Sequence, residues 1–149
     1  INITQAESLK IFSRRDKFLI DDIQSISGTG DFTTVKILGF SQELNLTLKY
    51  GSLLVENIAD KFSLINVGSI YTDIDLIFGK TAAYNLDITH FADVRLMYPT
   101  SLANLQTQNF NAEQKLFLTY GPVGSSATPS SPKVKIVAEK KCYINIIHR

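Results

Sequence analysis

The sequence predicts an all-β fold, a short β-solenoid (single-stranded, β-helix-like) of about six coils, each of roughly twenty residues. One short pattern recurs: the arrangement of aromatic, polar and apolar residues at positions 50–55 is repeated at residues 71–76 and again at residues 91–96. The aromatic residue that opens each copy is displaced by 71 − 50 = 21 and by 91 − 71 = 20 positions. Within each copy apolar and polar residues alternate, which is typical of a half-buried strand and fits a helix poorly.

The strand before each aromatic residue keeps a constant spacing. Three of its positions repeat twice at steps of 21 residues: Leu44, Leu46, Leu48; Ile65, Val67, Ser69; and Leu86, Ile88, His90. Units of this length cannot bury an apolar face alone, so we expect them to stack as parallel coils about 4.8 Å apart. The stack predicts one corner column of aromatic residues: Phe32, Tyr50, Tyr71, Phe91 and Tyr120. A second column is predicted from Ile58, Phe78 and Tyr98.

Weaker copies are expected on both sides of this central repeat. Residues 30–37 precede it, and residues 116–121 resemble residues 46–51 closely. Residues 134–147 read as the last coil. Three residues stand where that coil would place its aromatic corner: Lys140, Lys141 and Cys142.

The remaining segments are expected to be loops or an end cap. Residues 100–114, rich in Asn and Gln, and residues 121–132, which hold three of the four prolines, are predicted loops. Residues 1–27 fit the repeat poorly and suggest short strands around a charged turn at residues 14–16, forming a cap or the tail of a preceding segment. Residues 28–149 then form the repeat domain. The alternative architecture is an antiparallel β-sandwich, which needs no constant repeat length.

Composition narrows the function classes. Fifteen basic and fourteen acidic residues give a formal charge of +1, so no net field favours nucleic acid. Cys142 is the only cysteine, which excludes an intrachain disulfide and a multi-cysteine metal cluster. No apolar run approaches the roughly 20 residues of a membrane-spanning helix. The chain begins without a methionine, and we expect that a segment such as a signal peptide has been removed.

Enzyme motifs do not occur. The sequence holds no Gly-x-Ser-x-Gly elbow, phosphate loop or dinucleotide fingerprint, so we predict no catalytic residue, no cofactor and no metal. The two histidines, His90 and His148, lack the spacing of a metal motif. We expect His90 near a corner of the stack and His148 as a frayed surface residue. Cys142 lacks a partner base and is expected to be an inert corner residue.

Several carboxylates invite another interpretation. Asp73, Asp75, Asp87 and Asp93 could serve a polysaccharide-active solenoid, because glycosidic cleavage uses paired carboxylates. In the predicted register Asp73 and Asp93 are equivalent positions one coil apart, and Asp75 falls beside Arg95. All of them alternate with inward-facing apolar residues, which favours a solvated surface over catalysis. Candidate ligand-binding residues are Asp73, Asp93 and two exposed aromatics, Tyr98 and Phe110, with Tyr143 as a third aromatic that could stack on sugars.

Five segments carry a likeness to a known family: Lys49-Tyr50-Gly51-Ser52-Leu53, Tyr71-Thr72-Asp73-Ile74-Asp75-Leu76, Tyr98-Pro99, Thr119-Tyr120-Gly121, and the closing strand Lys133-Val134-Lys135-Ile136-Val137-Ala138-Glu139-Lys140. Together they resemble an adhesin-like family of unknown function, β-helical cell-envelope proteins of Bacteroides-type bacteria, over approximately residues 25–147. The resemblance implies a secreted or envelope location and no catalytic residues. The family often has glycine in its last coil, where this chain has Lys141-Cys142.

The expected function is therefore a non-enzymatic cell-envelope module that binds, adheres or serves structurally, with a surface glycan or an envelope protein as its partner. The alternatives are a polysaccharide-active β-helix enzyme and a lipid-handling or envelope-bridging protein. A periplasmic, outer-membrane-associated or extracellular location is expected. Because terminal coils expose unpaired backbone groups, end-to-end or edge-mediated association is also expected.

Overall fold

The computed structural model describes residues 1–149 and contains strands without any helix, which confirms the all-β prediction. The strands are β1 (Asn2–Arg14), β2 (Lys17–Asp31), β3 (Thr34–Ile37), β4 (Phe40–Lys49), β5 (Ser52–Ile58), β6 (Leu64–Ile70), β7 (Asp73–Phe78), β8 (Tyr84–Phe91), β9 (Arg95–Met97), β10 (Gln106–Asn111), β11 (Leu116–Val123), β12 (Lys133–Glu139) and β13 (Tyr143–His148). Only the pairings of β10 with β11 and of β11 with β8 are antiparallel. The antiparallel sandwich finds no support in this topology.

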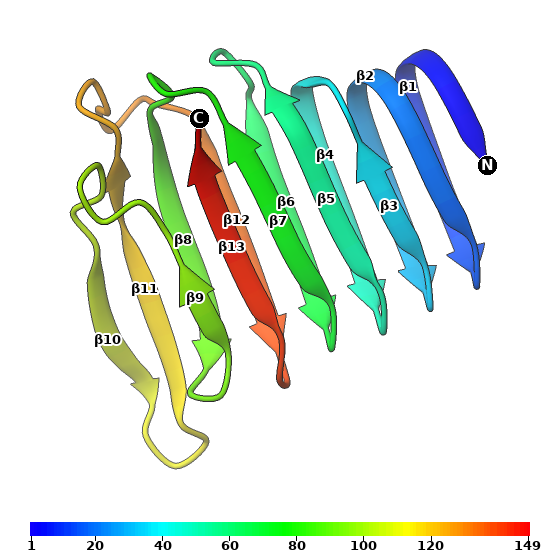
Figure 1. Ribbon diagram of the computed structural model, residues 1–149. Helices are drawn as coiled ribbons and strands as arrows, with labels where there is room; N and C mark the ends of the chain where they lie inside the picture. The colour runs from blue at the N-terminus through cyan, green and yellow to red at the C-terminus, as the bar shows by residue number, and fades with distance from the viewer.

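The strands lie in two facing layers (Figure 1). One layer follows the order β1, β2, β4, β6, β12, β8, β11, β10, and the other follows β2, β3, β5, β7, β13, β9. Strand β2 serves both layers, because residues 17–20 pair with β3 and residues 23–31 pair with β4. A pairing of Phe40 with Ile58 joins β4 to β5 and closes β2, β3, β5 and β4 into a ring.

The predicted register is correct over residues 30–78. Val35 pairs with Leu53 and Leu53 pairs with Ile74, in parallel. Leu44 likewise lies beside Ile65. Inward-facing side chains from both layers fill the space between them, and nearly all are fully buried. The alternation of apolar and polar residues thus sets both the strand faces and the core, as a period of two requires.

The C-terminal segment overturns the predicted stacking order. Strand β12 lies between β6 and β8, and β13 lies between β7 and β9 (Figure 1). Ile65 therefore pairs with Val134, and Val134 pairs with Leu86, so the predicted contact of Ile65 with Leu86 is wrong. The prediction failed because each coil presents a similar alternating apolar face, and spacing alone does not reveal which coils are neighbours.

Residues 100–123 also differ from the prediction. The expected loop at residues 100–114 contains β10, which forms a hairpin with β11. Residues 116–121 were predicted to repeat the parallel strand of residues 46–51, but β11 runs antiparallel to β8. The local alternation was read correctly, because it predicts a strand; it does not specify the direction of that strand.

Residues 1–27 form β1 and most of β2, so the predicted boundary at residue 27 falls inside a continuous strand. The charged turn at residues 14–16 does separate the two strands, with Arg15 in the left-handed region at φ 61°. The proline-rich loop begins after β11 ends at Val123 and is tied to β8 by Asn85, whose backbone N–H donates to Pro132 O at 2.8 Å and whose side chain donates to Thr128 O at 2.8 Å. No helix of the length and apolarity needed to cross a bilayer is present.

Candidate functional site

One corner of the stack carries an aromatic ladder made of Phe32, Tyr50 and Tyr71. Each of the three adopts a left-handed backbone, with φ between 49° and 55°, and each side chain is about half exposed. The ring centroids are 5.1 Å and 5.4 Å apart with planes inclined by 12°. Stacking of this kind stabilises by about 0.5–1.5 kcal/mol a pair, which offsets part of the cost of the backbone conformation.

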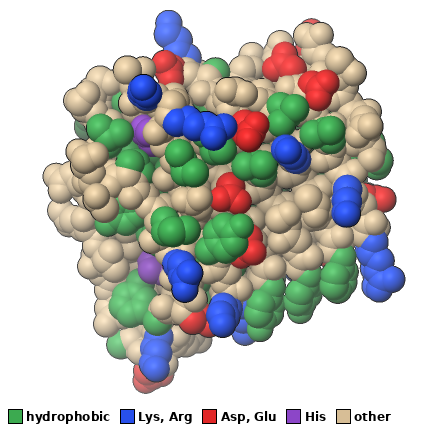
Figure 2. Space-filling model, viewed as in Figure 1, with side chains coloured by type: hydrophobic (Ala, Val, Ile, Leu, Met, Phe, Trp, Pro, Cys, Tyr) green, Lys and Arg blue, Asp and Glu red, His purple; other side chains and the backbone are tan.

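Basic residues occupy the two corners next to the ladder. The Arg15 guanidinium lies 5.7 Å from the Phe32 ring centroid, and Lys140 follows Glu139, whose carbonyl accepts the Tyr71 backbone N–H at 3.3 Å. In Figure 2 a row of exposed hydrophobic side chains follows the lower right edge of the molecule, with basic side chains at both ends. The prediction that Phe91 and Tyr120 extend this column is wrong, because β12 takes the place beside Tyr71 and β11 runs antiparallel.

The second predicted column is correct for its first pair only. Ile58 lies beside Phe78, but the next neighbour of Phe78 is His148, because β13 pairs with β7. Tyr98 instead packs, partly buried, against the edge of the core. The phenol of buried Tyr84 hydrogen-bonds His148 Nε2 at 2.7 Å. His148 is therefore an anchored residue of β13, and the expectation that it frays is wrong.

This anchor predicts an acid-sensitive contribution to stability. Burial lowers the pKa of His148, and the backbone of Lys80 opposes this shift only in part. Because the folded pKa lies below the unfolded value of about 6.5, the contribution is present above that pH and is lost as the pH falls below it. We expect the free energy of unfolding to decrease between about pH 7 and pH 5, measured by urea denaturation at each pH.

The matched variant is His148→Gln, because a glutamine side chain can accept a hydrogen bond from the Tyr84 hydroxyl but does not titrate. Its free energy of unfolding should lose this slope between neutral pH and the onset of carboxylate titration. An unchanged slope in the variant would show that other groups cause it.

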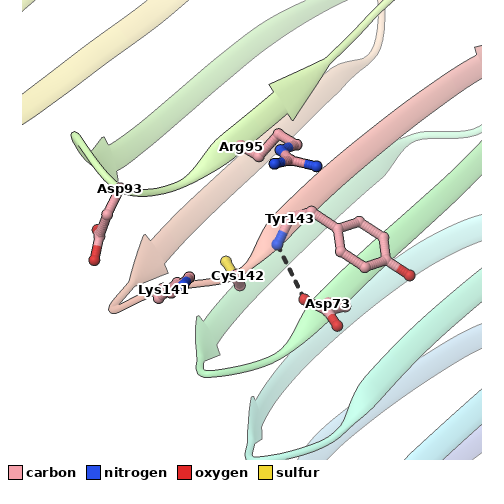
Figure 3. Close-up of a pocket in the computed structure, with 6 residues that line it drawn as sticks. All are labelled: Asp73, Asp93, Arg95, Lys141, Cys142 and Tyr143. Atoms are coloured by element: carbon pink, nitrogen blue, oxygen red, sulfur yellow. Dashed lines mark hydrogen bonds between the residues drawn. The ribbon is translucent and has the colours of Figure 1, made fainter.

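The strongest candidate site is a hollow of about 450 Å³ at the bottom of the β7, β13 and β9 layer (Figure 3). Three segments line it: the start of β7, the turn into β9, and the turn between β12 and β13. The lining residues are Asp73, Asp93, Arg95, Lys141, Cys142 and Tyr143. The structure thus brings the predicted Asp73 and Asp93 to one hollow, although β13 separates their strands and they are not adjacent coil positions.

Backbone and side-chain hydrogen bonds hold one wall of this hollow. The Tyr143 backbone N–H donates to Asp73 Oδ1 at 3.0 Å (Figure 3). Asp75 accepts from the Tyr143 hydroxyl at 3.5 Å and from the Asn145 side chain at 3.2 Å. The Asp75 carboxylate, with smaller effects of burial and of Asp73, raises the pKa of Tyr143, so its phenol stays protonated at neutral pH. The predicted pairing of Asp75 with Arg95 is wrong, because β13 lies between them.

The charged groups of the hollow are not paired with one another. The single ion pair of the structure joins Arg149 to Glu56 at 3.8 Å, away from this site. Two carboxylates, Asp73 and Asp93, therefore share the hollow with Arg95 and Lys141 without a salt bridge among them. Their charges sum to zero. Apart from Asp73 Oδ1, which accepts the Tyr143 N–H, their hydrogen-bonding groups remain available to a bound molecule.

Cys142 is a poor candidate for chemistry. Its thiol is buried, and burial raises its pKa, with further increases from Asp73 and Asp93 that the Ser69 hydroxyl partly opposes. A protonated thiol is neither a nucleophile nor a metal ligand. No three His, Cys, Asp or Glu side chains come together in an arrangement that could hold a metal ion.

The other sequence candidates lie elsewhere. Phe110 is exposed on β10, outside the hollow. His90 lies near the end of β8, where its Nε2 hydrogen-bonds Thr119 Oγ1 at 2.9 Å. Asp87 lines a smaller hollow on the opposite layer together with Lys133 and Lys135. Sequence reasoning named Lys141, Cys142 and Tyr143 separately, but it could not place them beside Asp73, because that contact depends on the inserted C-terminal coil.

Comparison with family models, with curated proteins and with solved structures gives no match to this chain.

Proposed function

We propose that this chain is a non-enzymatic binding module of the cell envelope, a short two-layered β-solenoid whose hollow binds a neutral, hydroxyl-rich ligand such as a glycan. The observation that carries the proposal is the set of four mutually unpaired charged side chains around the hollow, Asp73, Asp93, Arg95 and Lys141. The likeness to an adhesin-like envelope family supports the location and the absence of catalysis.

The chemistry of the hollow suits sugar hydroxyls. A carboxylate accepts hydrogen bonds from hydroxyl groups, and Arg or Lys donates to hydroxyl and ring oxygens. A hollow that contains both kinds can satisfy a polyol, whose hydroxyls donate and accept. Because the four formal charges cancel, a neutral ligand is favoured over a polyanion. The exposed ring of Tyr143, which Figure 3 shows extending over β7, offers an apolar face at the rim.

The stacked parallel coils of residues 17–78 support the solenoid interpretation, because each coil pairs with its neighbour in both layers. The C-terminal segment then acts as one further coil inserted into the stack. A lipid-handling role is less well supported, because the space between the layers is filled by buried side chains such as Phe62, Phe78 and Tyr84.

The proposal is tested by binding of the chain to an array of bacterial and host oligosaccharides. The variant pair Asp73→Asn and Asp93→Asn, made together, keeps the shape of both side chains and the acceptor for the Tyr143 N–H. Because a hydrogen bond to a charged group contributes about 1.5–3 kcal/mol, we expect at least about tenfold weaker binding. Asp87→Asn, on the opposite layer, is the matched control and should bind normally.

Three outcomes would oppose this function. Retention of no oligosaccharide, or equal retention by the double variant, would remove the hollow as a glycan site. Appearance of new reducing ends in the bound oligosaccharide would show cleavage and favour the enzyme alternative.

A further inference from the structure

The aromatic ladder of Phe32, Tyr50 and Tyr71 is explained neither by the core nor by the hollow. Bulky residues rarely adopt the left-handed backbone that all three share, whereas glycine adopts it without strain. Stacking of the rings offsets only part of this cost, and about half of each side chain remains exposed. Exposed apolar rings that are held in a strained conformation are typical of a surface that contacts another molecule.

The ladder lies on a convex corner of the molecule. Left-handed residues occupy this corner in five stacked turns, in the order Arg15, Phe32, Tyr50, Tyr71 and Lys140. Except in the last turn, the backbone N–H of the corner residue donates to the residue just before the next corner residue, as from Tyr50 to Ile70 O at 2.9 Å. Figure 2 shows the hydrophobic side chains in a row along the lower right edge. None of the five main hollows is lined by a ladder residue, so the ladder suits a broad surface and not a small ligand.

Positive charge gathers around the ladder. Arg15 covers the outer face of Phe32, and Lys140 occupies the corner beyond Tyr71. When each corner residue is counted with its two neighbours in the chain, basic residues outnumber acidic ones: Arg14, Arg15, Lys49, Lys140 and Lys141 against Asp16, Asp31 and Glu139. The corner is therefore more positive than the whole chain, whose formal charge is +1. The exposed edges of the stacked rings add to this, because an aromatic ring is electropositive at its edge.

We propose that this aromatic corner docks on an anionic lipid surface, with the three rings among the headgroups and the flanking cations on the phosphates. Phe and Tyr side chains are stable at the boundary between water and hydrocarbon, where an apolar ring and a polar tip are both satisfied. Lys and Arg beside them are attracted to the negative surface potential of anionic lipids. A convex row needs a matching groove on a protein partner, whereas a fluid lipid surface adapts to it. Because the rings enter by their edges, they can stay stacked in the contact.

A tryptophan reporter tests where the chain meets the lipid. The sequence contains no tryptophan, so Tyr50→Trp places a single indole on the ladder. With vesicles of phosphatidylcholine and about one-third phosphatidylglycerol, its emission should shift to shorter wavelength and be quenched by brominated acyl chains. Leu102→Trp is the matched control and should show neither change. Leu102 is exposed at the opposite end of the strands, where its carbonyl accepts the Gly124 N–H at 2.8 Å.

Charge reversal tests the cations without removing a ring. Lys49→Glu and Lys140→Glu, made together, should weaken binding to these vesicles at least about tenfold, because each basic residue at an anionic surface strengthens the attraction. Lys133→Glu and Lys135→Glu change the net charge by the same amount on the exposed face of β12. Because charges far from the contact are screened, this control pair should weaken binding by less than about threefold. Co-sedimentation with the vesicles measures both effects.

A chain that does not sediment with the anionic vesicles would overturn the inference and would leave the ladder as a surface for a protein partner. Equal losses in the two lysine pairs, or quenching of the tryptophan at position 102, would overturn the corner as the place of contact. Equal binding to vesicles of phosphatidylcholine alone would overturn the role of charge. These measurements contain no sugar and the oligosaccharide array contains no lipid, so failure here is distinguishable from failure of glycan binding.

Discussion

Replacing Ile136 by Ala is expected to lower the free energy of unfolding by about 3 kcal/mol, within the range of roughly 2–5 kcal/mol seen for buried Ile-to-Ala changes. Ile136 is fully buried between Val67 of β6 and Ile88 of β8. Removing its side chain leaves a cavity with packed strands on both sides, and these cannot close over it without disrupting two ladders. The large effect is a direct consequence of the inserted position of β12.

Urea denaturation measures this effect, with Lys135→Ala as the matched control. Lys135 is the exposed neighbour on the same strand, and its substitution should change the free energy of unfolding by less than about 0.5 kcal/mol. Leu9→Ala, on strand β1, which pairs on one side only, should lower the free energy of unfolding by an amount between these two values. If Ile136→Ala cost no more than Leu9→Ala, β12 would lie at the edge of the stack as the repeat spacing predicted.

The sequence was sufficient to predict the strand register where the repeat is continuous along the chain. Over residues 30–78 each copy of the repeat directly follows the previous one along the chain, so the spacing of the copies also gives the register of their strands. The pairing of Ser52 with Asp73 and the stacking of Tyr50 on Tyr71 were both predicted from the 21-residue step. The aromatic corner could be predicted because its residues recur at the point where the chain turns.

The insertion of residues 133–148 could not be predicted from spacing. Ile65 is covered equally well by Leu86 or by Val134, because both are inward-facing apolar residues of a parallel strand. The choice depends on the loop that precedes β12, and loop closure depends only weakly on length. The one local signal was the corner at Lys140, which lacks the aromatic residue of the neighbouring coils.

The candidate site was likewise predicted from the repeat only in part. Asp73 and Asp93 were named because they occupy equivalent positions of the repeat, and both do line the hollow. Their predicted adjacency was wrong, since Tyr143 of β13 lies between the two strands. The insertion of β12 and β13 also brings Lys141 and Tyr143 to the hollow. The combination of acidic and basic side chains in the hollow could therefore not be predicted from the repeat alone.

The second large effect is expected at Gly28, where any side chain would collide with the neighbouring strand. A Cβ atom at this position would lie 1.8 Å from the Ile11 carbonyl oxygen, and the backbone has φ 129°, which other residues rarely adopt. The contact is with backbone, so it cannot be relieved by a rotamer change. Gly28→Ala should lower the free energy of unfolding by at least about 2 kcal/mol.

Gly68→Ala is the matched control for Gly28→Ala, since Gly68 lies in β6 and a Cβ atom there would meet only the Thr47 side chain, at 3.3 Å. This change should be neutral within about 1 kcal/mol, because alanine also restricts the unfolded chain. The collision at Gly28 pushes directly on β1, so hydrogen exchange should become faster in β1 before the whole chain unfolds. Equal stability of the two glycine variants would mean that β1 does not pack against β2 at Ile11.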